Sequence, residues 1–157
     1  MTYHRFLTLS ALVAGLAFSG SLALAETATH DHQAGGSLTL TLNAGAKWQG
    51  DDNMLKGMSR IREAIATRLP AIHGRTLTPA DSKLLASDIQ GQVDFMVQNC
   101  KLKPEVDAQF HIVLAEVMDG ISELEGETEP HRGAIKIAQA LNAYGTHFEH
   151  PNWQPLE

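Results

Sequence analysis

Sulfur and imidazole groups are the side chains in this sequence with the most chemistry to offer. The chain holds 5 methionines, 1 cysteine and 8 histidines. Thioether, thiolate and imidazole groups suit copper(I), and imidazole with methionine also binds haem iron. We therefore predict a soft-metal site, for copper in particular. The predicted metal ligands are Met54, Met58, Met96, Cys100, His111, His147 and His150.

Four segments with apolar residues at helical spacing must position these groups. The first helix is capped by Asp51-Asp52 and ends before Pro70, and the second begins at the Thr78-Pro79 cap. The third opens at Pro104, and the fourth opens near Thr128 and Pro130 and is stopped by Pro151. The predicted buried stripes are Met54, Met58, Ile61, Ile65 and Leu69; Leu85, Ile89, Val93, Met96 and Cys100; Phe110, Leu114, Val117, Ile121 and Leu124; and Ile137, Leu141, Tyr144 and Phe148.

Short connections between these segments predict an all-α fold, an up-down-up-down four-helix bundle over residues 51–150. An extended arm (37–50) precedes it and a tail (151–157) follows. In this topology the predicted ligands gather at one end of the bundle. At about 1.5 Å rise per residue, Met58 and His111 would both lie roughly 10 Å from that end.

Each predicted ligand also has a structural interpretation. Methionine in a helical core is usually filler, and a free cysteine packs as a small apolar residue. His111 could be a buried histidine bonded to an oxygen, while the helix dipole alone favours His147 at a helix end. A module without a cofactor is therefore as well supported as copper binding. In that module, Lys47-Trp48 and the Trp153 segment dock partners or brace the bundle.

A b-type haem protein that transfers electrons is a third, weaker alternative, with Met58 or Met54 and His147 as axial ligands. Covalent haem is excluded because the sequence has no Cys-x-x-Cys-His. The sequence also has no nucleophile elbow, phosphate-binding glycine loop or His-Glu-x-x-His motif. We therefore predict that the protein is not an enzyme.

Residues 1–25 are typical of a secretory signal peptide, with Arg5, an apolar run and a terminal Ala23-Leu24-Ala25. A membrane anchor is the alternative interpretation. Cleavage after Ala25 predicts a periplasmic protein, free of the membrane, that starts with a disordered polar tail (26–36) containing His30-Asp31-His32. Loss of Arg5 changes the net charge from -6 to about -7, which argues against nucleic-acid binding. The expected partner is a metal ion or a periplasmic protein, and the oligomeric state stays open.

Several stretches of this chain resemble two protein families. Leu42 to Trp48, Gly57 to Arg62, Asn99 to Leu102 and Tyr144 to Pro151 resemble small exported proteobacterial proteins described as DnrO-like, which implies an exported helical domain. Asp52-Asn53-Met54 and Asn142-Ala143-Tyr144 resemble short stretches of the periplasmic four-helix b-type cytochromes. The residue after that tyrosine is Gly145 rather than a histidine, and the nearest imidazole is His147.

Overall fold

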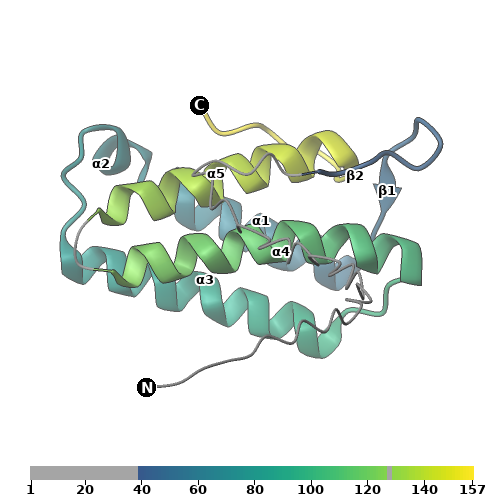
Figure 1. Cartoon of the computed structure of the whole chain (residues 1–157), viewed down its shortest axis with the longest axis horizontal. Helices are drawn as coiled ribbons and strands as arrows, with labels where there is room; N and C mark the ends of the chain where they lie inside the picture. Colours follow the sequence, from purple (N-terminus) through teal and green to yellow (C-terminus); the bar gives the residue numbers. More distant parts are fainter. Residues whose placement is uncertain (1–38, 127–128) are drawn as a thin grey trace, which may run out of the picture. The chain divides into compact units, whose positions relative to one another are not determined.

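The computed structural model of the protein describes residues 39–126 and 129–157. They belong to one compact unit, Gly35–Glu157. Five helices account for most of them: α1 (Asp52–Ala66), α2 (Leu69–His73), α3 (Pro79–Asn99), α4 (Pro104–Glu125) and α5 (Pro130–His147) (Figure 1). The predicted all-α class is therefore confirmed. The predicted signal peptide, the polar tail and His30-Asp31-His32 lie outside the described residues.

The predicted starts of α1 and α3 are confirmed by their capping hydrogen bonds. Asp51 has an extended backbone, and its Oδ1 accepts the Met54 N–H at 2.8 Å. Thr78 Oγ1 accepts the Asp81 N–H at 3.1 Å, and Pro79 occupies the first turn of α3. Both caps satisfy N–H groups that have no partner within their own helix.

Two predicted helix ends were wrong, and one predicted stripe residue lies just beyond its helix. α1 ends at Ala66, and Pro70 lies in the first turn of the separate short helix α2. Proline has no N–H to give and is tolerated in a first turn, so it can open a helix where we expected it only to follow one. α3 ends at Asn99, which leaves Cys100 as an extended cap.

The second wrong end is that of α5, which ends at His147 rather than running to Pro151. Phe148 instead forms strand β2 (Phe148–Glu149) and pairs in parallel with β1 (Trp48–Gln49). Phe148 is fully buried, so its place in the predicted apolar stripe is right although its backbone is extended. A short strand pair, which the sequence alone did not predict, thus joins the arm to the end of α5.

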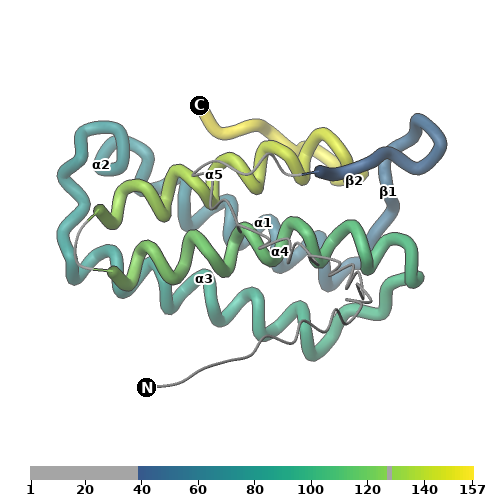
Figure 2. The backbone as a smooth tube through the Cα atoms, viewed as in Figure 1, coloured from purple at the N-terminus to yellow at the C-terminus, as the bar shows by residue number. Residues whose placement is uncertain are grey.

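The predicted stripes form the hydrophobic core. All their residues are buried except Leu69 and Cys100, which are partly buried. α1 packs on α3, α3 on α4 and α4 on α5, and α1 also contacts α5 (Figure 2). The helices therefore share one core.

α4 and α5 come closest where two glycines meet. A Cβ added to Gly133 would lie 2.4 Å from the Gly120 carbonyl oxygen and 2.7 Å from the Leu124 nitrogen. Both are backbone atoms, which side-chain rearrangement cannot move aside. The absence of a side chain at Gly133 is thus what allows the two backbones to approach.

The described part of the arm is held on the helices of its own chain. It turns at Ala44 (φ 50°) and Gly45 (φ 89°), where Asn43 and Ala46 form an isolated antiparallel bridge. The Thr41 N–H donates to Gln109 Oε1 of α4 at 2.8 Å, and Lys47 Nζ donates to the Gly145 carbonyl of α5 at 2.7 Å. The arm therefore spans the end of the helical unit.

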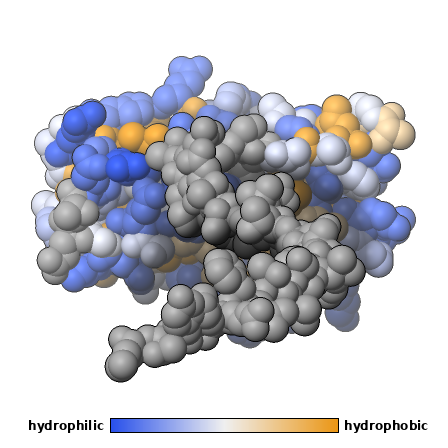
Figure 3. Space-filling model, in the orientation of Figure 1, coloured by the Kyte–Doolittle hydropathy of each residue, from blue (hydrophilic) through white to orange (hydrophobic). Residues whose placement is uncertain are grey.

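The large exposed apolar side chains come from the arm and three helices: Leu42, Leu84, Val97, Met118 and Ile135. On the face in Figure 3, the described surface is mainly hydrophilic and its apolar residues form small separate groups. Among the described helices, none has the length and apolar character needed to cross a membrane.

Candidate functional site

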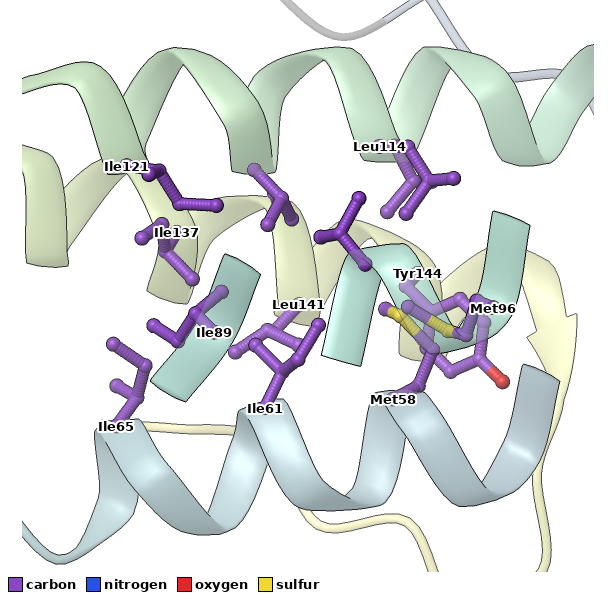
Figure 4. Packing of buried hydrophobic residues seen from close by; sticks show 14 of the residues in the cluster. Met58, Ile61, Ile65, Ile89, Met96, Leu114, Ile121, Ile137, Leu141 and Tyr144 are labelled. Atoms are coloured by element: carbon purple, nitrogen blue, oxygen red, sulfur yellow. The ribbon is translucent and has the colours of Figure 1, made fainter. Parts of the chain in front are cut away.

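Three of the predicted ligands are buried thioethers on α1 and α3. Met54 and Met58 lie one turn apart on α1, and neither has exposed surface; Met96 of α3 is 1% exposed. Gly57 leaves room for Met96 against α1, because a Cβ there would lie 2.4 Å from Met96 Sδ. Figure 4 shows the Met58 and Met96 side chains extending toward one another beside Tyr144.

Cys100 lies one turn beyond Met96 and is partly buried. Burial, followed by the nearby Asp51 carboxylate to which the thiol hydrogen-bonds, raises the pKa of Cys100 to about 12. The thiol is therefore protonated at neutral pH, whereas the thiolate is the metal-binding form.

Asp51 itself is occupied by structural hydrogen bonds. Besides capping Met54, its Oδ2 accepts the Lys101 N–H at 2.6 Å. Burial would raise the pKa of Asp51, but hydrogen bonds from Lys101, Met54, Cys100 and Asn53 outweigh it and hold that pKa below its usual value. Asp51 thus fastens the start of α1 to the end of α3.

His111 lies away from the methionines. Its side chain is 67% exposed, and Nδ1 lies 2.9 Å from the Asp107 carbonyl oxygen and 3.4 Å from Asp107 Oδ2. Phe110 and Leu114 supply the buried face of α4 at this level, and His111 falls outside it. The structural alternative we gave for His111 was a buried histidine, and its exposure makes that alternative wrong.

His147 is half-buried at the last turn of α5. Its Nδ1 lies 2.8 Å from the Ala143 carbonyl oxygen and 3.0 Å from Thr146 Oγ1. A ring nitrogen this close to a carbonyl oxygen carries the proton, so Nε2 is the nitrogen left with a lone pair. This imidazole keeps one nitrogen suited to a metal, although no contact joins it to the three sulfur atoms.

His150 is held between two hydroxyl groups. Nδ1 lies 3.0 Å from the Tyr144 hydroxyl, and Nε2 lies 3.0 Å from Ser59 Oγ on α1. Burial lowers the pKa of His150, which favours a neutral ring. With both nitrogens occupied, His150 serves as a structural link between α1 and α5.

The sequence alone did not predict the contact between Ser59 and His150. Ser59 is an exposed residue on an amphipathic helix, and it lies 91 residues from His150, so no local pattern connects the two.

The C-terminal segment continues from this link along α1 and α5. The Trp153 indole packs edge-on against Tyr144, with ring centroids 4.9 Å apart, and the Arg62 guanidinium lies over it. Asn142 accepts the Leu156 N–H and donates to the Leu156 carbonyl, both at 2.8 Å. Trp153 therefore braces the helices, which was one of the two roles we considered for it.

The described residues do not fit a haem held by Met58 or Met54 and His147. A Cβ at Gly145, where the resembling cytochromes carry histidine, would lie 2.2 Å from Trp153 Nε1. Both methionines are packed without exposed surface, and a haem needs an open space between its ligands. None of three hollows among the described residues is lined by Met54, Met58 or His147.

The imidazole, thiol and carboxylate groups do not form a metal-binding cluster among the described residues either. Among residues 39–126 and 129–157, no group of three or more His, Cys, Asp or Glu side chains could hold a metal ion. Among the predicted ligands, Met58 and Met96 are the pair of sulfur groups whose side chains extend toward one another (Figure 4). Comparison of the chain with protein-family models, with curated proteins and with solved structures finds no match.

Proposed function

We propose that this protein binds copper(I) in the periplasm through a buried cluster of methionine sulfur atoms. The observation that supports this proposal best is the position of Met96, which lies against Gly57 of α1 and extends toward Met58, with Met54 buried one turn away on α1 (Figure 4). Thioethers are soft, neutral ligands that select copper(I), and they bind it without having to lose a proton. Export, inferred from residues 1–25, places such a site outside the reducing cytosol.

The proposed ligand set is smaller than the one read from the sequence. Met54, Met58 and Met96 form it. His111 is left out because it is exposed elsewhere, and His150 because both of its nitrogens are engaged. The raised pKa of Cys100 argues against a thiolate ligand at neutral pH.

We further infer that α1, α3, α4 and α5 run up, down, up and down. Asn53 Nδ2 donates to the Asn99 carbonyl at 2.9 Å, which ties the start of α1 to the end of α3. The arm reaches Gln109 in the second turn of α4 and Gly145 near the end of α5. These ties support a shared end for the four helices, next to the methionines.

Copper(I) competition against a colorimetric chelator tests the proposal on the mature chain from Glu26. Changing Met54, Met58 and Met96 together to leucine keeps most of the apolar volume and removes the sulfur. We expect the triple variant to lose copper(I) affinity at least about tenfold. Met118→Leu is the matched control, because Met118 is 51% exposed on α4 and outside the cluster. Equal affinity in the triple variant and the parent would show that the methionines only fill the core.

An interaction module without a cofactor is the second candidate. It is favoured by the internal contacts of His111, His147 and His150, which give each of them a structural role. A mature protein that purifies without metal and does not compete for copper(I) would favour this candidate. Haem titration that leaves the protein colourless would agree with the poor fit of the haem ligands.

A further inference from the structure

A polar hollow of about 750 Å³ lies between the arm and the α3–α4 connection. Lys47, Trp48 and Gln49 line it on the arm side, and Lys101 and Lys103 line it on the other. Such a volume is in the range that holds a small organic ligand or a few peptide residues. We call this hollow the arm cleft.

The arm cleft is rich in cationic groups for so acidic a chain. Three of the chain's 12 lysines and arginines line it, although the whole chain carries a net charge of -6. Within the described ranges, neither Lys101 nor Lys103 forms an ion pair or a side-chain hydrogen bond, and both are exposed. The ammonium groups of these two residues are therefore available to a ligand.

The acidic residues of the arm cleft neutralise these lysines only in part. Asp51 turns both carboxylate oxygens toward backbone N–H groups, so its charge is already stabilised within the fold. Glu105 is exposed in the first turn of α4, where the helix dipole favours it. Trp48 is fixed by its indole, which donates to the Thr41 carbonyl, so the arm wall has a set position.

We infer that the arm cleft binds an acidic peptide segment, whose carboxylates pair with Lys101 and Lys103 while its backbone lies along the Trp48 wall. Charge complementarity carries the choice of ligand, and the volume favours several linked residues over a single small anion. This inference does not involve the methionine sulfurs and does not depend on copper binding.

The test follows amide and indole resonances of the mature chain by NMR during titration with tri-glutamate. We expect saturable shifts at the Trp48 indole and at residues 101–103, with little change at the Trp153 indole. Lys101→Gln with Lys103→Gln should weaken binding about fivefold, because exposed ion pairs contribute modestly and two are lost. Lys83→Gln, an exposed lysine outside the cleft, is the matched control and should leave the affinity unchanged.

Two further titrations decide what is recognised. Tri-lysine should give no saturable shifts, since it carries the opposite charge. Inorganic phosphate at equal ionic strength should bind more weakly than tri-glutamate. Phosphate binding as tight as that of tri-glutamate would overturn peptide recognition, and so would equal affinity in the parent and the double variant. Because none of these variants touches Met54, Met58 or Met96, failure here leaves the copper proposal standing.

Discussion

Asp51 connects the start of α1 to the end of α3, and its removal gives the sharpest test of how this end of the fold is held. Asp51→Ala deletes the cap on Met54 and the acceptor for the Lys101 N–H. Loss of an N-cap costs about 1 kcal/mol. A second lost hydrogen bond adds roughly another 1 kcal/mol. The expected loss in the free energy of unfolding is therefore about 2 kcal/mol.

Urea unfolding of the chain from Glu26 onward, followed by circular dichroism, measures this loss. Asp51→Asn should cost about 1 kcal/mol, because asparagine keeps the cap on Met54 but its amide nitrogen cannot accept the Lys101 N–H. Asp52→Ala is the matched control, since Asp52 is the exposed neighbour in the first turn and contributes mainly through the helix dipole. If Asp51→Ala costs no more than Asp52→Ala, the assignment of Asp51 as a structural link is wrong.

The same variants report on Cys100. Asp51→Asn removes a negative charge beside the thiol, so the pKa of Cys100 should fall from about 12. Burial is the larger cause of the raised value and remains, so the pKa should stay above the ordinary 9.0. Thiolate absorbance during a pH titration measures both effects, and an unchanged titration would refute the contact.

Asp51 also gives stability a defined dependence on acid. Its pKa is lowered in the folded chain, so the unfolded chain takes up the proton first. The contribution of Asp51 is complete above its unfolded pKa near 3.8 and is lost as the pH falls through the lower folded value. Asp51→Asn should remove this part of the acid dependence.

Three other perturbations have defined outcomes. Gly133→Ala should destabilise the protein by about 3 kcal/mol, because its Cβ would meet backbone atoms of α4. Gly91→Ala has open space around its Cβ and should stabilise the protein by about 0.5 to 1 kcal/mol. Thermal unfolding compares the two variants. Burial lowers the pKa of His150, so its contribution to stability is complete above pH 6.5 and declines as the pH falls toward its folded pKa. In His150→Gln, the free energy of unfolding in urea should therefore depend less on pH between about 7.5 and 5.5. An unchanged dependence on pH would contradict the position of His150 in the fold. Gly145→Ala should displace the Trp153 indole, seen as a red shift and loss of intensity in tryptophan fluorescence, while Gly91→Ala should leave that emission unchanged.

Local patterns in the sequence determined the fold class and the composition of the core. Apolar residues at steps of three and four predicted which faces of the helices are buried, because helical geometry places those positions on one side. Asp51 and Thr78 were recognised as caps because a short oxygen-bearing side chain before an apolar period satisfies the first N–H groups. Pro70 misled the prediction of a helix end, because proline is equally suited to the first turn of the next helix.

The candidate site depended on contacts between distant parts of the chain, which the sequence does not encode locally. Met96 reaches α1 only because Gly57 leaves room there, and the two residues lie on different helices. His111 was predicted to share an end with the methionines, but it lies on the outward side of α4, where its side chain is exposed. His150 and Trp153 acquired structural roles from Ser59, Tyr144 and Gly145, partners chosen by the packing of the C-terminal segment. Residue types therefore determined which chemistry was available, and tertiary packing decided which of those groups meet.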